Sequence, residues 1–325
     1  MSYSFLRESK LYIVYGEEGG TLYKYRVYTS SAITFNQTFA EESYSVKTLH
    51  DQSKMFEGSS ITKANPASFS FDVPLTIEKD ESIVLTLVSD LSSSNTINSF
   101  DMYVQTGSST FKLEGAVITS ASFDFLPENP FTMRVEGQGI KLTRADDEDF
   151  TIPGDGVTGS DYTTDPLPSY NELSSRTRTP LLVYPIITLT DQTPDPDVVK
   201  IMGNILSVNL TIQNEMEWTP YETLHDSLNS TTMFPSAHTV GKRIISGEIR
   251  QYQIDNNVAQ FDDFSTNTSL TITAKNVSGD ANFLEVAINP VMYTARMQPT
   301  EVYTQSYDFR SLHNTNLVST QITYS

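Results

Sequence analysis

Residues 67–75 read Ala-Ser-Phe-Ser-Phe-Asp-Val-Pro-Leu, and in this stretch apolar and polar side chains alternate. Successive side chains of an extended chain point to opposite faces, so Phe69, Phe71 and Val73 share one face. The serines and the aspartate between them share the other. A period of two therefore predicts a strand with one face in a core and one face in water. This strand indicates a mainly β fold.

Working outward, further apolar runs predict antiparallel hairpins in the same half of the chain. Each pair of runs flanks a short segment rich in Gly, Pro, Ser or Asn, the residues that favour tight turns. The paired runs are 11–14 with 23–28, 100–104 with 111–113, and 117–125 with 131–135.

The segment 83–91 is the exception, because its apolar residues follow a helical period. They recur at i, i+1, i+4, i+5 and i+8 and would form one apolar face of a short helix. Ile and Val are also frequent in strands, which leaves a strand at 83–88 as the alternative. Residues 258–264 occupy the equivalent place in the C-terminal half, with weaker periodicity. The apolar residues of the first segment are Ile83, Val84, Leu87, Val88 and Leu91.

Composition and charge exclude several classes of protein. The chain has 325 residues, 17 Tyr, 17 Phe and many β-branched residues, which is typical of a folded β-rich protein. Forty acids against 21 bases give a formal charge of −19. Stable binding to nucleic acid or to anionic membranes needs a basic surface, so both are disfavoured. The chain has no cysteine, which excludes disulfides, thiolate zinc sites and cysteine nucleophiles.

No targeting segment is visible. The first residues, Met-Ser-Tyr-Ser-Phe-Leu-Arg-Glu, lack the basic and apolar regions of a signal peptide. The apolar runs are also far shorter than a membrane span. We therefore expect the protein to be made in a cytoplasm and to have no membrane partner.

The chain contains an internal repeat. Thr48-Leu49-His50-Asp51 recurs as Thr223-Leu224-His225-Asp226, 175 residues later. Other matches follow in the same order with offsets that drift by a few residues, as loop insertions produce. They predict a tandem duplication with domains at 1–145 and 180–325. The further matches are Ile33 and Phe35 with Val208 and Leu210, Met55-Phe56 with Met233-Phe234, Phe100 to Val104 with Leu270 to Ala274, Phe111 with Phe283, and Phe125 with Met297.

The segment 146–179 between the predicted domains is acidic and contains several Pro and Gly residues. From Ala145 to Ser175 there is no Lys or Arg. Such a stretch repels itself and buries little apolar surface, so we interpret it as a linker or a long surface loop. A calcium loop around Asp155 and Asp161 is the functional alternative, but the spacing of an EF-hand is absent.

We find no constellation that indicates chemistry, and the sequence predicts no enzyme, no catalytic or cofactor-binding residue, no metal ligand and no cofactor. The four histidines form no metal-binding spacing, and nucleotide-binding glycine motifs are missing. The repeated His50-Asp51 and His225-Asp226 could be acid–base pairs. We favour the alternative that they cap a turn or bond to the backbone.

One long segment in each predicted domain is neither a clear strand nor a clear helix. The two segments run from about Thr38 to Asn65 and from about Gln213 to Thr239, and both contain the repeated motifs. A connection of that length inside a small domain is expected to be functional.

The order of these elements resembles the tail tube proteins of tailed bacteriophages. It runs from a hairpin through a long loop, the alternating strand 69–75, a short helix and a second hairpin to the stretches 113–117 and 123–127. The resemblance implies a β-sandwich or barrel with one flanking helix and a long inter-strand loop per domain, and six domains per ring. Two tandem domains per chain resemble the siphophage tail tube of the T5 type, in which trimers give pseudo-sixfold rings. An extra immunoglobulin-like domain of that type is not evident here.

The resemblance also implies a function. The chain would be a structural subunit of the virion that self-assembles into stacked rings and forms the conduit for DNA ejection. Its partners would be further copies of itself and the tape measure, baseplate and terminator proteins, with DNA as a cargo that passes without sticking. Two alternatives stay open: another tail component such as a hub, baseplate ring or terminator, and a carbohydrate-binding β-protein.

In that family the long loop reaches the neighbouring ring, so the resemblance places inter-ring contacts in both long segments. The alternative is that their apolar side chains hold the loop to its own domain. The implied contact residues are Leu49, His50, Asp51, Met55, Phe56, Leu224, His225, Asp226, Met233 and Phe234.

An acidic conduit wall would repel DNA and let it slide. Strand positions that could supply such a wall are Asp72, Asp124 and Glu136. The alternative is that these acids lie on the outer surface and favour solubility.

Overall fold

A computed structural model gives the fold as strands β1–β20 and one helix, α1, over the described part of the chain. The predicted mainly β fold is confirmed. None of the described helical residues forms a helix long and apolar enough to cross a membrane. The described residues are 9–16, 22–48, 51–76, 81–89, 97–106, 109–126, 129–146, 162–164, 180–191, 198–218, 233–235, 237–252, 268–276, 282–289, 291–298, 302–311 and 322–324.

The N-terminal half contains two sheet layers that share the long strand β8. In one layer β1 lies between β2 and β7, β7 pairs with β8, and β10 pairs with the other edge of β8. This layer contains the first two predicted hairpins, which are confirmed. Its strands are β1 (Lys10–Gly16), β2 (Leu22–Val27), β7 (Phe100–Gln105), β8 (Ser109–Phe125) and β10 (Lys141–Asp146). A short strand, β11 (Tyr162–Thr164), runs parallel to β2 and lies within the segment predicted to be a linker.

The second layer is formed by β3 (Thr34–Asn36), β6 (Ala67–Pro74), β9 (Thr132–Gly139) and the C-terminal part of β8. The strand β8 passes from one layer to the other at Gly115, whose φ is +56°. Glycine adopts this conformation without strain.

Asp101 lies beside this crossing point. The Gly115 N–H donates to Asp101 Oδ1 at 3.0 Å. Asp101 also lies 3.2 Å from Lys112 Nζ; burial alone would lower the pKa of Lys112, but Asp101, Tyr103 and Glu114 outweigh it and raise the pKa.

The helix α1 (Ser82–Ser89) confirms the helical prediction for this segment, and the alternative of a strand at 83–88 is wrong. Ile83, Val84 and Leu87 are buried in the hydrophobic core. An amphipathic segment can bury that face against a sheet only as a helix, because its apolar residues recur every three to four positions. Leu91 and the second predicted helix, residues 258–264, lie outside the described residues.

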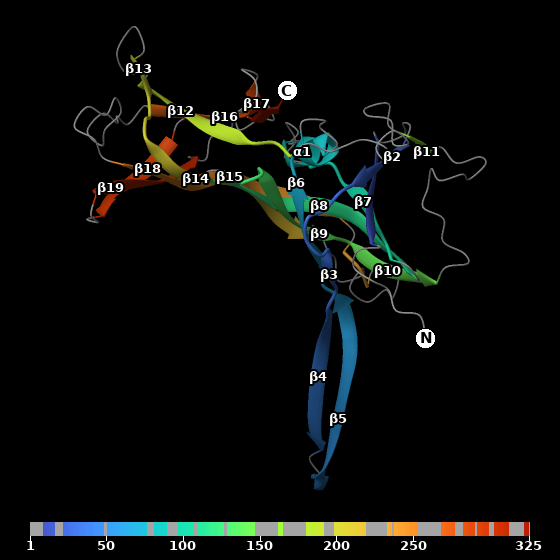
Figure 1. The fold of residues 1–325 in the computed structure, drawn as a ribbon. Coiled ribbons are helices and arrows are strands. Elements are labelled where there is room, and N and C mark those ends of the chain that lie inside the picture. The colour runs from blue at the N-terminus through green and yellow to red at the C-terminus, as the bar shows by residue number, and fades with distance from the viewer. Residues whose placement is uncertain are drawn as a thin grey trace.

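The C-terminal half also has two layers, and one core cluster runs through both halves. A five-stranded sheet has the order β13-β12-β16-β17-β20. It lies over a second group of strands with the order β14-β15-β19-β18 (Figure 1). The strands are β12 (Val183–Asp191), β13 (Val198–Ile201), β16 (Thr268–Asn276), β17 (Asn282–Ile288), β20 (Ile322–Tyr324), β14 (Ile205–Trp218), β15 (His238–Tyr252), β18 (Val291–Gln298) and β19 (Thr304–Ser311).

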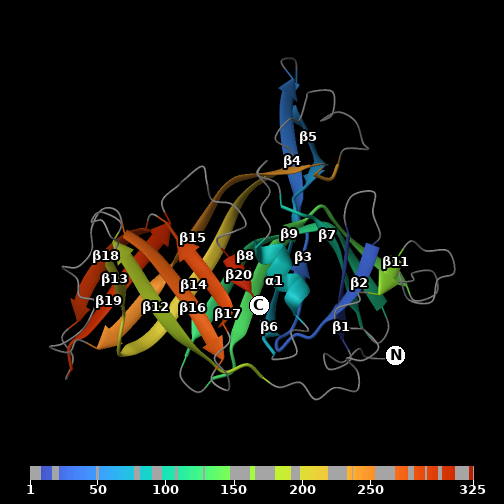
Figure 2. The ribbon, with the colours of Figure 1, turned by 90° about the horizontal axis from the view of Figure 1, so that it is seen from above.

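The two halves are joined by an antiparallel pairing of β8 with β14, which we call the joint. Its register runs from Val208 opposite Phe125 to Gln213 opposite Ser120. Through the joint, strands of both halves belong to one 13-stranded sheet (Figure 2). The described strands form open sheets and close no barrel, because β3 and β18 lie at opposite ends of the run β3-β6-β9-β8-β14-β15-β19-β18.

The first long segment is a hairpin and not a loop, which corrects the sequence interpretation. Strands β4 (Phe39–Thr48) and β5 (Asp51–Ala64) pair with each other and form a separate two-stranded sheet. The hairpin continues from β3 and β6 and projects far from the body of the protein (Figure 1). The second long segment forms the end of β14, the start of β15 and a connection that lies mostly outside the described residues.

A matched pair of glycines occurs in the two halves. In one, Phe69 on β6 lies opposite Gly137 on β9; in the other, Gly247 on β15 lies opposite Phe309 on β19. A Cβ atom at Gly137 would lie 2.4 Å from the Val117 carbonyl oxygen, and one at Gly247 would lie 2.0 Å from that of Asn209. In both halves the ring of the opposing Phe lies where a side chain on the glycine would have to go. Each pair therefore needs one ring and one glycine.

We expect Gly247→Ala to destabilise the protein by about 2–3 kcal/mol, because the new methyl group must displace backbone. Gly241 on the same strand is the matched control, since a Cβ there would meet only the Glu215 carbonyl oxygen at 3.7 Å. Gly241→Ala should change stability by less than about 0.5 kcal/mol. Thermal unfolding followed by circular dichroism measures both. Equal unfolding temperatures for the two variants would contradict this account of the glycine pair.

Candidate functional site

The run of strands from β3 to β18 has one face in the core and one polar face. Along β6 and β9 the burial alternates residue by residue, as the sequence predicted for residues 67–75. The register of the joint continues this face across the chain, since Ser122 lies opposite Thr211 and Asp124 opposite Asn209. Side chains directly opposite each other on antiparallel strands share a face. The polar face is thus a single surface built from both halves.

The three acids predicted for a conduit wall all lie on the polar face. Asp72 is on β6, opposite Arg134. Glu136 is on β9, 3.0 Å from the Arg134 guanidinium. Asp124 is on β8 and accepts a hydrogen bond from the Asn209 side-chain amide. The structure therefore brings these residues onto one surface, and it adds a base beside them that the sequence analysis did not consider.

The C-terminal half of the polar face repeats this pairing of opposite charges. Glu215 lies 3.1 Å from Lys242, Glu248 lies 2.8 Å from Arg250, and Asp308 lies 3.2 Å from Arg296. The hydrogen bond from Arg250 to Glu248, with the charge of that carboxylate, raises the pKa of Arg250. Six acids and five bases occupy the polar face as far as the bulge after Glu215: Asp72, Asp124, Glu136, Glu215, Glu248 and Asp308, with Arg134, Lys242, Arg250, Arg296 and Arg310. This face is nearly neutral, although the chain carries −19.

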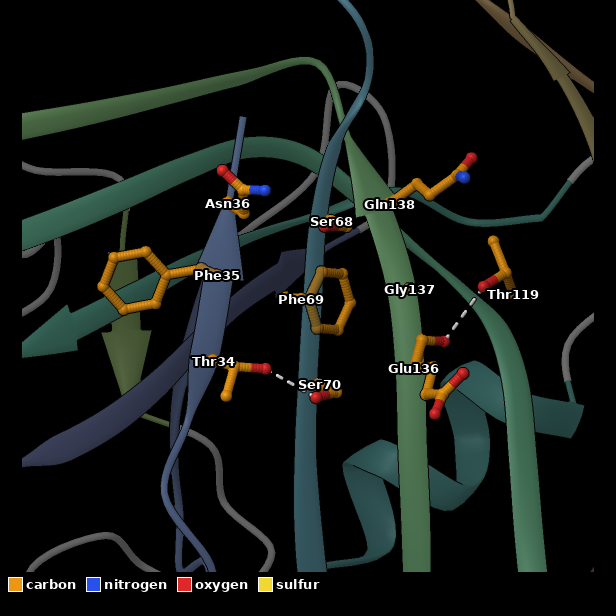
Figure 3. Close-up of a pocket in the computed structure, with 10 residues that line it drawn as sticks. All are labelled: Thr34, Phe35, Asn36, Ser68, Phe69, Ser70, Thr119, Glu136, Gly137 and Gln138. Carbon is orange, nitrogen blue, oxygen red and sulfur yellow. Dashed lines mark hydrogen bonds between the residues drawn. The ribbon is translucent and has the colours of Figure 1, made fainter. Parts of the chain in front are cut away.

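Two open hollows mark corresponding places on the polar face. One, of about 320 Å³, lies over β3, β6 and β9 and is shown in Figure 3. In it Thr34 bonds to Ser70 at 2.6 Å, and Thr119 Oγ1 donates to the Glu136 carbonyl at 3.2 Å. The other, of about 430 Å³, lies over β14, β15, β18 and β19. Both are open to solvent and are lined by polar and apolar side chains together, unlike the enclosed, mainly apolar pockets that bind small molecules. Within the described ranges, no cluster of His, Asp and Glu could hold a metal ion.

The predicted contact residues fall into three groups. Asp51, Met55 and Phe56 are on β5 of the projecting hairpin. Met233 and Phe234 lie at the base of that hairpin: the Ala64 N–H donates to the Met233 carbonyl oxygen at 2.8 Å, and Lys141 Nζ lies 5.2 Å from the Phe234 ring centre. The remaining residues, Leu49, His50, Leu224, His225 and Asp226, lie outside the described residues.

A buried arginine stabilises the joint, and the sequence analysis missed it. Arg243 on β15 is 5% exposed and donates to Asn214 Oδ1 at 2.8 Å. It also donates to the Ser89 and Val88 carbonyl oxygens, at 3.0 and 2.5 Å. These carbonyls end α1, where a cation is favoured by the helix dipole. A residue of the second half thus caps the helix of the first.

Two comparisons with known proteins indicate what this chain is similar to. Residues 1–136 match the Bacteriophage Baseplate Tube Protein Family. The matched stretch ends within β9 and so covers most of the N-terminal half of the fold, without β10. No match to a curated protein was found. The match supports the predicted resemblance to phage tube proteins over the first 136 of the 325 residues.

We expect Arg243→Met to destabilise the protein by about 2–4 kcal/mol, because it leaves the C-terminal carbonyls of α1 and the Asn214 amide oxygen without their buried donor. Arg250→Met is the matched control on the same strand. Arg250 is exposed and pairs only at the surface, so its loss should change stability by at most about 1 kcal/mol. Denaturant unfolding of both variants measures the difference. Equal losses would show that Arg243 does not fasten the joint.

Proposed function

We propose that the chain is the structural subunit of a phage tail tube. Each chain contributes two tandem tube domains, residues 1–145 and 180–325, connected by 146–179. Three chains form a ring of pseudo-sixfold symmetry, and the rings stack into the conduit through which DNA leaves the virion. The match of residues 1–136 to a baseplate tube family supports the class of protein. We assign the chain no catalytic activity and no membrane partner.

The observation that carries this proposal is that the two halves repeat one pattern of strand pairing. In the first half β6 pairs with β3 and β9, and β9 pairs with β8; in the second, β15 pairs with β14 and β19, and β19 pairs with β18. Ser70 opposite Glu136 corresponds to Glu248 opposite Asp308. The next pair along is Phe69 with Gly137, which corresponds to Gly247 with Phe309. A tandem duplication explains this correspondence more simply than chance does.

The polar face is suited to the wall of a conduit. Hydroxyl and amide side chains alternate with ion pairs, and the described part of the face has no unpaired basic cluster of the kind that holds DNA through counterion release. DNA can then pass without binding. Under this proposal the face lines the lumen, and the acids Asp72, Asp124 and Glu136 are part of its lining.

The hairpin β4–β5 is suited to contact a neighbouring ring. Among the described strands it pairs only with itself, and it projects beyond the sheet layers (Figure 1). A long two-stranded ribbon is marginally stable in water alone, so a surface outside the body of the chain would stabilise it. We propose that Met55 and Phe56 are among its contacts.

A baseplate ring is the second candidate, because the matched family is described as a baseplate tube family. The two candidates share the ring and differ in stacking. A tube subunit stacks on copies of itself, whereas a baseplate ring occurs once and binds other tail proteins above and below. The tape measure, the terminator and other baseplate proteins are the proposed partners in either case.

Negative-stain electron microscopy of the purified protein tests the tube. We expect rings with a central hole that stack into tubes as the concentration rises. Replacing residues 43–59 by Asn-Gly joins Glu42 to its cross-strand partner Ser60 and shortens the hairpin in register. This variant should form rings that do not stack, and Met55→Ser with Phe56→Ser should weaken stacking. Unshortened tubes from both variants would contradict the inter-ring role, and a matching thermal unfolding curve controls for the fold.

Charge on the wall can be tested by DNA ejection from phage that carry substitutions. Glu136→Gln leaves Arg134 without its carboxylate and turns a neutral pair into a cation on the proposed wall. We expect slower ejection, by a few-fold at low salt, with recovery at high salt as screening increases. The double variant Arg134→Gln with Glu136→Gln keeps the net charge and should eject at the wild-type rate. Unchanged kinetics in the single variant would place this face outside the lumen.

A further inference from the structure

The strands at the two ends of the run, β3 and β18, have one edge each that pairs with no described strand. β3 pairs with β6 on its other side, and β18 pairs with β19. Exposed strand edges invite pairing with another chain, and natural proteins protect them unless they are used. These edges are the places where the polar face could continue beyond a single chain.

The joint already shows what pairs at such edges. By the repeat of strand pairing, β14 occupies in the second half the place that β3 has in the first, and β8 occupies the place of β18. The joint of β8 with β14 inside the chain is therefore the counterpart of a contact between β18 of one chain and β3 of the next. That contact is head-to-tail, so it generates a ring when its rotation closes.

Burial of apolar side chains points to the same contact. At the joint, Phe123 and Leu210 lie opposite each other and both are 0% exposed. Their counterparts are Met297 on β18 and Phe35 on β3. Met297 is 53% exposed, and Phe35 is half-buried against Phe111. The joint thus covers both apolar side chains. At the free edges Met297 is exposed and Phe35 is covered only in part, so a second copy would bury more of both.

The strand pairings fix the correspondence residue by residue. Thr34 opposite Ser70 matches Asn209 opposite Glu248, so β14 lies 175 residues after β3, as predicted. Ser120 opposite Glu136 matches Thr294 opposite Asp308, so β18 lies 174 residues after the corresponding part of β8. The sequence match of Phe125 with Met297 is therefore wrong by two residues, and Met297 corresponds to Phe123. The connection from β18 to β19 is two residues shorter than the connection from β8 to β9. The sequence comparison alone did not locate this difference.

We propose that β18 of one chain pairs antiparallel with β3 of a second copy, in the register that the joint transfers to these edges. This inference rests on the proposed function, because it specifies how the ring is closed. The backbone pairs are Thr34 with Gln298, Phe35 with Met297, Asn36 with Arg296, Gln37 with Ala295 and Thr38 with Thr294. Phe35 and Met297 then meet on the core side, and Asn36 and Arg296 extend the polar face.

Engineered disulfides test both the contact and its register, because the natural chain has no cysteine. Asn36→Cys with Arg296→Cys places the two thiols directly opposite each other across the proposed contact. Opposed Cα atoms lie about 4.5–5.5 Å apart, within the range that a disulfide spans. We expect mild oxidation to give a ladder of covalent oligomers that ends at the closed ring. Mixing the two single variants should give dimers only, as a head-to-tail contact requires.

Two further cysteine pairs serve as controls for the cross-linking experiment. Asn36→Cys with Thr294→Cys shifts the register by two residues on the same face, where Cα atoms are about 7–8 Å apart, and should cross-link about tenfold less. Ser122→Cys with Thr211→Cys is the equivalent pair at the joint and should form a disulfide inside one chain. Its formation without loss of thermal stability shows that cysteines on these strands are tolerated.

The outcomes separate the contact from the function. Rings in the microscope without the Asn36–Arg296 cross-link overturn the contact and leave the tube intact. Preferential cross-linking of the shifted pair overturns the register. A cross-linked ladder from protein that never forms rings supports the contact and overturns the tube. Protein that neither assembles nor cross-links at any concentration overturns both.

Discussion

The backbone pairing of β8 with β14 is the contact on which the rest of the structure depends. It converts two sets of sheet layers into one, since residues 83 or more positions apart in sequence become neighbours, beginning with Phe125 and Val208. The polar face is continuous only because this register keeps side chains of both halves on one side. Arg243 stabilises the same contact from the core side, because its hydrogen bonds link β15 to β14 and to the C-terminal end of α1. A hydrogen-bonded ladder with a buried cation behind it resists slippage, since a shift of one residue would turn every side chain to the wrong face.

Much of the fold was predictable because its signals are local. The alternation at Phe69, Phe71 and Val73 and the helical spacing from Ile83 to Val88 each follow from which side must be buried. The hairpin β4–β5 was not predictable in this way. Among the described strands, β4 and β5 pair only with each other, and residues 38–65 show no clear alternation that would have separated a hairpin from a loop. The joint was also not predictable from local patterns, because the sequence of neither strand indicates which distant strand it pairs with.

The site was half predictable for a similar reason. Net charge suggested an acidic wall, and the three acids chosen do lie on one face. The bases beside them were readable too, since Arg134 with Glu136 and Glu248 with Arg250 are two positions apart on a strand and so share a face. The net charge of the whole chain does not reveal such local pairs of acid and base. Arg243 could have been noticed as a cation in the same inward row of β15 as Ile245 and Ile249, but its partners on α1 come from the other half of the chain.

The reversed pairs of Phe69 with Gly137 and Gly247 with Phe309 decide whether strands of the two halves could be exchanged. If β15 replaced β6, glycine would face glycine and leave a void; if β6 replaced β15, two rings would compete for one space and for the backbone around Asn209. Exchanging only one of these two strands between the halves would therefore destabilise the chain. Both members of a Phe–Gly pair would have to move together to keep one ring and one glycine in each half.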